Sequence, residues 1–137
     1  MKVIKNALKK NGFTCLDDAK NGQTAVDLTM KKKYDLILMD IEMPIKDGLT
    51  AASDIRTNTQ NPNKITPIIA LTANATNIAQ NNCATVGMNL YLTKPLNTFD
   101  LMFSIAPLGP FNLYDLKYCP HILLYDVRTN GRGFAEV

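Results

Sequence analysis

Asp40, Thr72 and Lys94 each follow a short apolar run of the sequence, and their side chains could together carry phosphoryl chemistry. The runs have the length of buried β-strands, and in an open parallel sheet the carboxyl ends of the strands line the crevice where ligands bind. A carboxylate can be phosphorylated directly to an acyl phosphate. A hydroxyl can donate a hydrogen bond to a phosphoryl oxygen, and an ammonium group can offset its roughly −1.5 to −2 charges. We therefore expect Asp40 to be a phosphoryl acceptor.

The positions of these residues depend on helices and strands that alternate along the chain. Residues 3–10 have apolar side chains at helical spacing, and Asn11-Gly12 supplies a stop. The other expected elements are strands at 13–16, 34–40, 67–72 and 90–92, and helices at 22–33, 48–56, 76–86 and 98–105. The pattern breaks after Ala106. This alternation predicts an α/β fold with a doubly wound parallel sheet and right-handed crossovers.

Composition favours a soluble, cytoplasmic domain. The 137 residues are 46% hydrophobic and 20% charged, and the apolar runs are too short to cross a bilayer, so we expect no membrane contact and see no secretory signal. Cys15, Cys83 and Cys119 are widely spaced, which suggests neither a disulfide framework nor a zinc site. The net charge of +3 gives little support for nucleic-acid binding.

Three motifs on the expected strand ends resemble one family. They read Met39-Asp40-Ile41-Glu42-Met43-Pro44-Ile45-Lys46-Asp47-Gly48, then Leu71-Thr72-Ala73, then Lys94-Pro95. In this order and at this spacing they resemble the receiver domain of two-component response regulators, more particularly the kind attached to hybrid histidine kinases. The resemblance covers residues 2 to about 105. We expect residues 1–106 to form a receiver-like domain truncated at its N-terminus, followed by a non-family tail at 107–137.

The resemblance implies a flavodoxin-like receiver fold with strand order 2-1-3-4-5 and a role for each matching residue. Asp40 would be the phosphoacceptor, and Lys94 the counter-ion of the phosphoryl group. Thr72 would bind a phosphoryl oxygen and form a switch with Tyr91, an aromatic residue that turns inward and reshapes the output face.

The resemblance also implies a magnesium site beside the acceptor. Asp40 and the backbone carbonyl of Glu42 match two ligands of Mg²⁺ in the family. Structural roles fall to Pro44, to Gly48 in the turn that closes the loop, and to Pro95, whose bond with Lys94 aims the lysine inward.

The chain departs from the family at its beginning. The family starts with a strand that ends in two adjacent acids, which hold magnesium, and this chain begins inside the following helix. Asp17-Asp18 is a poor substitute, because the strand that carries it would be an edge strand, separated from the strand of Asp40 by the missing one. With fewer acids, Mg²⁺ should bind poorly.

The tail offers a replacement for the missing strand. His121 to Asp126 is a short apolar run that ends on an acid, and residues 107–120 could return the chain to the central gap. The strand at 122–126 would then lie between residues 14–17 and 35–39, as in a circular permutation, and Asp126 would stand beside Asp40. The alternative is a truncated receiver with an unrelated tail.

The leading functional hypothesis is a phosphorelay receiver that accepts a phosphoryl group from a phosphohistidine of a histidine kinase or a histidine phosphotransfer domain. It would be a signalling module and not an enzyme, with at most self-phosphotransfer and autodephosphorylation. A second hypothesis is a degenerate receiver that acts as a phosphorylation-independent interaction module. A third is an aspartyl-nucleophile phosphohydrolase of the haloacid dehalogenase type, for which Asp40-Ile41-Glu42 is a near miss. A flavodoxin-like ligand binder ranks last, because no Gly-rich phosphate loop is present.

Overall fold

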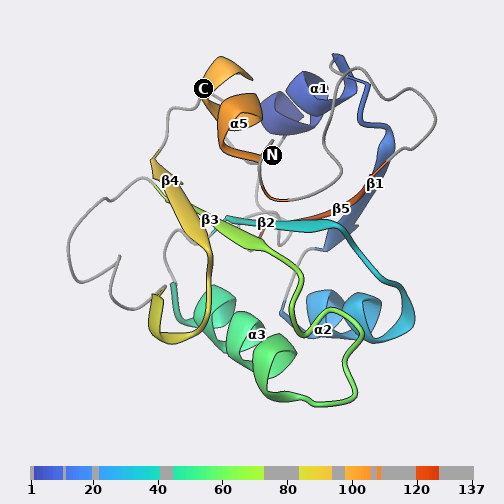
Figure 1. Cartoon of the computed structure of the whole chain (residues 1–137), viewed down its shortest axis with the longest axis vertical. Helices are drawn as coiled ribbons and strands as arrows, with labels where there is room; N and C mark the ends of the chain where they lie inside the picture. Colours follow the sequence, from blue (N-terminus) through green and yellow to red (C-terminus); the bar gives the residue numbers. More distant parts are fainter. Residues whose placement is uncertain are drawn as a thin grey trace.

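A parallel sheet with helices on both of its faces forms the centre of the chain (Figure 1). The computed structural model describes residues 2–10, 12–19, 22–40, 45–72, 84–93, 98–105, 108 and 120–126. Within these ranges the elements are α1 (Lys2–Lys10), β1 (Cys15–Ala19), α2 (Gly22–Lys31), β2 (Leu36–Asp40), α3 (Ile45–Thr57), β3 (Ile68–Thr72), β4 (Leu90–Thr93), α5 (Thr98–Ile105) and β5 (His121–Asp126). The sheet has the strand order β1-β5-β2-β3-β4, and every neighbouring pair is parallel.

The last described strand, β5, lies in the interior of the sheet. Residues His121 to Tyr125 of β5 pair in register with β1, and residues Ile122 to Asp126 pair in register with β2. Relative to the family order 2-1-3-4-5, β5 takes the place of the first strand. The expected fold class, with the tail in the central gap, is therefore confirmed.

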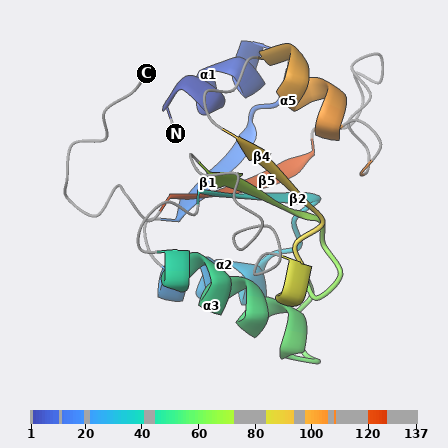
Figure 2. The same cartoon turned by 90° about the vertical axis from the view of Figure 1, so that its left-hand side faces the viewer.

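Side chains of the sheet alternate between two cores, as the period of two along a strand requires. Ile37, Met39 and Leu123 belong to the core beneath α2 and α3, together with Ala25, Ala51, Ala52 and Ile55 of those helices. Leu36, Leu38, Ile122 and Leu124 belong to the opposite core with Leu8 of α1 and Leu101 and Ile105 of α5. Figure 2 shows these two helical layers on opposite sides of the sheet. The continuous apolar sequences of β2 and β5 reflect burial on both faces.

The turn after α1 follows the expected stop signal. Gly12 has a φ of 90°, which glycine adopts without steric cost. The amide of Gly12 donates to the carbonyl of Lys9 (3.1 Å), and the amide of Phe13 donates to that of Leu8 (2.9 Å). This pair of bonds is a Schellman motif, which ends the helix and turns the chain toward β1.

Several element boundaries differ from the expected ones. The first strand runs from Cys15 to Ala19 and not over residues 13–16. Helix α3 begins at Ile45, three residues before the expected start at Gly48. Of the weak helix expected at 76–86, residues 76–83 lie outside the described residues, and Ala84 and Thr85 are helical.

Truncation of Leu123 in β5 should destabilise the fold strongly. The side chain is fully buried, and Leu123→Ala should lower the free energy of unfolding by about 2–5 kcal/mol because it removes burial and leaves a cavity. Leu90→Ala in β4 is the matched control, since Leu90 is 40% exposed and should lose under about 1 kcal/mol. Urea unfolding measures both values, and equal losses would contradict the central placement of β5.

Candidate functional site

The carboxyl ends of three neighbouring strands bring the main chain of Asp126, Asp40 and Thr72 to one edge of the sheet. Asp40 ends β2, where its backbone partners are Asp126 of β5 and Leu71 of β3. Thr72 ends β3 beside Thr93 of β4. Because adjacent strands lie about 4.8 Å apart, the main chain of Asp40 is a direct neighbour of Asp126 and is one strand from Thr72.

The local sequence explains why β2 carries an acid at its end and nowhere before it. Residues Leu36 to Met39 are fully buried between the two helical layers. An unpaired carboxylate would be costly in that setting, so the charged residue falls where the strand leaves the core. The main chain of Asp40, Thr72 and Asp126 is described, whereas their side chains, and Glu42, Pro44, Lys94 and Pro95 altogether, lie outside the described residues.

Tyr91 and Gly48 have clear positions within the fold. Tyr91 pairs with Ala70 in the β3–β4 ladder, and its half-buried side chain packs against the core beneath α2 and α3. Gly48 lies in the first turn of α3. The preceding residues 41–44 lie outside the described residues, so the expected role of Gly48 in the turn that closes the loop stays a prediction. The earlier start of α3 fits its sequence, since Ile45-Lys46-Asp47 contains no residue that breaks a helix.

The pairing of Asp40 with Asp126 bears on a metal site. Mg²⁺ prefers oxygen ligands and is usually held by one or two carboxylates together with water and phosphate oxygens. Two acidic residues on adjacent strand ends supply that donor type. The residue types therefore fit a magnesium ion. The family's site combines the acceptor with two adjacent acids, whereas this chain has Asp126 followed by Val127 and so has one acid fewer.

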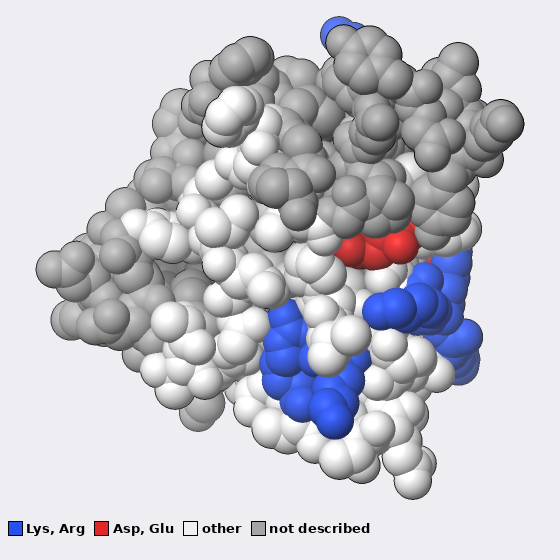
Figure 3. Space-filling model, viewed as in Figure 1, with Lys and Arg blue, Asp and Glu red and all other residues white. Residues whose placement is uncertain are grey.

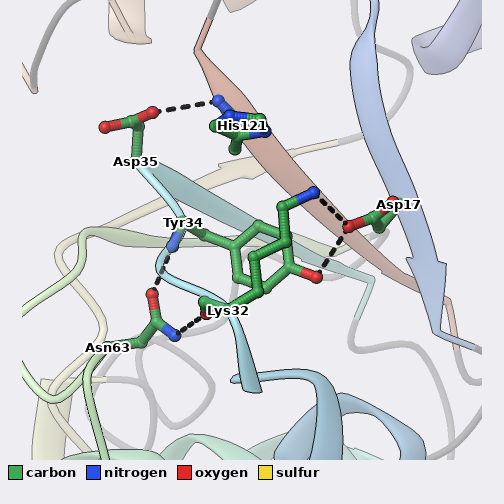
Figure 4. A network of polar contacts seen from close by, with 6 residues as sticks. All are labelled: Asp17, Lys32, Tyr34, Asp35, Asn63 and His121. Carbon is green, nitrogen blue, oxygen red and sulfur yellow. Dashed lines mark hydrogen bonds and ion pairs between the residues drawn. The ribbon is translucent and has the colours of Figure 1, made fainter. Parts of the chain in front are cut away.

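A polar network joins β1 to the residues before β2 (Figure 4). The Tyr34 hydroxyl donates to Asp17 Oδ2 (2.8 Å), and Lys32 Nζ forms an ion pair with the same oxygen (3.0 Å). Burial acts to raise the pKa of Asp17, but the bonds from Tyr34 and Lys32 outweigh it and lower the pKa below the usual 3.8. Burial and the Asp17 contact raise the pKa of Tyr34, so its hydroxyl stays protonated.

Asn63 is the buried centre of this network. Its Oδ1 accepts bonds from the Tyr34 amide (2.6 Å) and the Thr66 hydroxyl (2.9 Å), and its Nδ2 donates to the carbonyls of Thr29 and Lys32 (2.7 Å each). The side-chain amide is fully satisfied. Sequence reasoning missed this residue, because the loop at 58–66 indicates a turn but not which asparagine is buried.

Asp17 and Asp18 do not lie beside Asp40. They belong to edge strand β1, which β5 separates from β2. Asp17 is bound by Tyr34 and Lys32, and Asp18 pairs with Lys5. Among the described residues, no group of three or more His, Cys, Asp or Glu side chains could hold a metal ion.

The basic residues of α2 and α3 lie near the ends of these helices. Figure 3 shows Lys and Arg in two groups on the half of the molecule that holds α2 and α3. Lys31 and Arg56 occupy the last turns, where cations interact favourably with the helix dipole. Arg56 also donates to the carbonyl of Gly87 (2.9 Å) and to Asn89 Oδ1 (2.9 Å), and burial lowers its pKa. The cation thus ties the end of α3 to the segment before β4.

The comparison with known proteins identifies the family. Residues 1–106 match the family model of the response regulator receiver domain. The chain therefore belongs to the response regulator receiver family, a family of signalling domains. Within the described residues, no helix has the length and apolar character needed to span a membrane.

Relatives of the chain include large kinases and a smaller regulator. Hybrid signal transduction histidine kinase G of Dictyostelium discoideum is 42% identical over 112 residues, which cover 81% of this chain and 3% of the kinase. Transcriptional regulatory protein PdtaR of Mycobacterium tuberculosis is 36% identical over 98 residues, 72% of this chain and 45% of that protein. The chain thus spans only a part of these relatives.

Solved receiver structures share the fold. The receiver domain of sensor histidine kinase PA1611 from Pseudomonas aeruginosa, crystallised with a magnesium ion coordinated in its active site cleft, is 36% identical with a TM-score of 0.68. The match covers 78% of this chain and 85% of that one. Vibrio cholerae chemotaxis protein CheY4 has a TM-score of 0.68 at 25% identity, covering 78% of this chain and 87% of that one.

The Tyr34–Asp17 bond predicts a stability difference that depends on pH. A carboxyl group whose folded pKa lies below its unfolded value stabilises the fold above the unfolded pKa and loses this effect as the pH falls through the folded pKa. Tyr34→Phe should therefore lower the free energy of unfolding by about 1 kcal/mol at neutral pH. The difference from wild type should shrink below pH 3.8, the usual pKa of the group.

Urea unfolding at neutral and acidic pH measures this difference. Tyr91→Phe is the matched control, since the hydroxyl of Tyr91 does not bond Asp17, and its effect should not follow the titration of Asp17. A Tyr34→Phe loss that is the same at both pH values would contradict the assignment.

Proposed function

We propose that the chain is a phosphorelay receiver in which Asp40 accepts a phosphoryl group from a phosphohistidine. The donor would be a histidine kinase or a histidine phosphotransfer domain, as the kinase relatives suggest. A carboxylate oxygen of Asp40 attacks phosphorus, the new P–O bond forms as the P–N bond to histidine breaks, and the imidazole leaves. The chain acts as a signalling module without metabolic turnover, apart from self-phosphotransfer and autodephosphorylation. The odd, widely spaced cysteines favour a reducing compartment such as the cytoplasm.

The observation that carries the proposal is the register between β2 and β5. It makes Asp40 and Asp126 backbone partners at the carboxyl edge, where ligands bind in open parallel sheets. Thr72 ends the next strand, and Lys94 follows the described end of β4. We assign Thr72 to binding a phosphoryl oxygen and Lys94 to neutralising the developing charge.

Asp40, Asp126 and the carbonyl of Glu42 would hold a magnesium ion. When bound, such an ion neutralises charge on the phosphoryl oxygens during transfer. Asp126 acts here by placing a second carboxylate beside the acceptor. The side chain that follows it, Val127, adds no ligand, so affinity for the metal should be lower than with two adjacent acids.

We assign the response to phosphorylation to Thr72 and Tyr91. Tyr91 is half-buried in β4, where its backbone partner is Ala70 of β3. A phosphoryl group that draws the Thr72 hydroxyl toward the site would leave space into which the Tyr91 ring can turn. The surface at edge strand β4, on the side of α2 and α3 where Tyr91 packs, would then change its shape for a partner.

The competing function is a receiver that binds its partner without phosphorylation. The observation that favours it is that neither sequence neighbour of Asp126, Tyr125 or Val127, supplies the second acid of the family's pair. Both functions require the same fold, so a folded chain that never forms an acyl phosphate would belong to the second. Chemical phosphorylation therefore separates them.

Asp40→Asn should abolish phosphorylation without loss of the fold. Incubation of the wild-type chain with acetyl phosphate and Mg²⁺ should add one phosphoryl group that is released by hydroxylamine, as expected for an acyl phosphate. Intact-mass spectrometry measures the adduct, and circular dichroism checks the fold. The matched control is Asp27→Asn, an exposed acid of α2 that should leave the adduct unchanged. A folded wild-type chain without adduct would establish the competing function.

Asp126→Asn should weaken Mg²⁺ binding while Asp40 stays in place. Loss of one carboxylate ligand should lower the apparent affinity by about tenfold or more, in the range seen for changes around metal ligands. Isothermal titration calorimetry with Mg²⁺ alone measures this change, with Asp18→Asn in edge strand β1 as the control. Equal affinities for wild type and Asp126→Asn would remove Asp126 from the site.

A further inference from the structure

Strand β5 is the last described element of the chain. It nevertheless lies between β1 and β2, the first two strands in the sequence. Its neighbours β1 and β2 are consecutive strands connected through α2, and together they define a strand slot, the edges of residues 15–19 and 36–40 that face β5. Figure 1 shows β5 in red between the blue and cyan strands. The sheet is therefore complete only when β5 has entered it.

The contacts that hold β5 in the slot do not depend on which chain supplies the strand. They are the two backbone ladders and the burial of Ile122, Leu123 and Leu124, which are at most 1% exposed. The Asp35 amide donates to the His121 carbonyl (2.8 Å), and the His121 amide donates to Asp35 Oδ2 (2.9 Å). A second copy of the chain carries the same strand and would form the same contacts.

A slot without β5 leaves the sheet with unpaired strand edges. Before β5 enters, both edges present unpaired backbone groups, and open strand edges are templates for pairing with another chain. The apolar residues of β2 would also lose their packing against Ile122, Leu123 and Leu124. These conditions apply to every chain that has been synthesised through α5 and not yet through β5.

The length of the connection between α5 and β5 determines whether a slot binds the β5 strand of its own chain or that of another copy. Residues 106–120 lie between α5 and β5 and could reach about 50 Å when extended. Ile105 at the end of α5 lies in the same buried core as Ile122 and Leu124 of β5, so both ends of the connection lie on one face of the sheet. A chain can thus fill its own slot, with an effective concentration of about millimolar for a connection of this length. Copies at much lower concentration cannot compete, whereas copies near that concentration can.

We propose that β5 exchanges between two copies of this chain during folding at high concentration, which yields dimers in which each slot holds the partner's strand. The exchange is a form of domain swapping, which costs little because it reuses existing contacts. It does not require phosphorylation. Its consequence for the proposed function is that each acceptor site would combine Asp40 of one copy with Asp126 of the other.

A disulfide across the β1–β5 ladder reports which chain fills the slot. Cys15 and His121 are backbone partners, and the bonds of His121 to Asp35 use its main-chain atoms, so His121→Cys keeps them. The variant is made with Cys83→Ser and Cys119→Ser, refolded at micromolar and at near-millimolar concentration, and then oxidised. Dilute refolding should give intrachain disulfides, and the ratio of dimer to monomer should rise about tenfold for each tenfold increase in concentration.

Persistence on dilution separates exchange from surface association. Exchanged dimers should survive dilution before oxidation, because their separation requires opening the central strand, and non-reducing gels should show covalent dimers. The same variant with Cys15→Ser is the control and should give no such band. Intrachain disulfides after near-millimolar refolding, or dimers that dissociate on dilution, would overturn the proposal.

Complementation between two full-length variants tests the same exchange without a disulfide. Leu123→Pro disrupts β5 and leaves the slot intact, whereas Leu38→Pro disrupts the slot and leaves β5 intact, because proline removes a ladder bond from a central strand. Each variant alone should fail to give protease-resistant protein. The two refolded together should give one completed sheet per pair of chains.

The control mixture is Leu123→Pro with Ile122→Pro, in which neither chain supplies an intact β5. It should yield no protease-resistant protein. Complementation that exceeds the sum of the separate variants supports exchange. A mixture of Leu123→Pro and Leu38→Pro that yields no more than that sum would overturn it.

Discussion

The pairing of β5 on both of its edges is the constraint on which the rest of the structure depends. It joins edge strand β1 to the block of β2, β3 and β4, and it supplies Leu123 to one core and Ile122 and Leu124 to the other. Without it, backbone groups of β1 and β2 would lose their partners inside the sheet, at a cost comparable to that of many unmade hydrogen bonds. The same pairing sets Asp126 beside Asp40, so one register determines both the fold and the candidate site.

The amino-terminal and carboxyl-terminal ends of the strands carry different kinds of residues. Near the amino-terminal ends of the strands, Asn63 and the Tyr34–Asp17 contact satisfy polar groups internally and hold the connections between elements. The carboxyl edge instead carries the strand-end residues Asp40, Thr72 and Asp126. The described groups with clearly shifted pKa values, Asp17, Tyr34 and Arg56, all have structural partners away from that edge. The shifted pKa values of these three residues therefore arise from structural contacts. Structural ion pairs and burial shift pKa values just as functional sites do.

Much of the architecture could be predicted from sequence, for local reasons. Asn11-Gly12 ends α1 through the conformation of a glycine, and residues 36–39 form an unbroken apolar run because the strand is buried on both faces. The placement of residues 121–126 required a further step, the recognition that a receiver fold lacked its first strand. The role of Asn63 could not be predicted, because three of its four bonds reach residues far away in the sequence, Thr29, Lys32 and Tyr34, and depend on the finished fold. The start of α3 was missed because Gly48 was given the weight of a turn residue, although helices tolerate glycine at a cost of about 1 kcal/mol.

The order of the elements couples the assembly of the site to the completion of folding. In this chain the acid next to Asp40 is supplied by the last described strand, so a chain with an empty slot has Asp40 but not its neighbour. A cation held by both carboxylates would bind only the completed sheet, and by mass action it would stabilise the docked position of β5. The reverse also holds, since any substitution that weakens β5 pairing must weaken such binding even when it lies far from the carboxyl edge. Leu123, which contacts the core and not the edge, is thus coupled to the site through the register of a single strand.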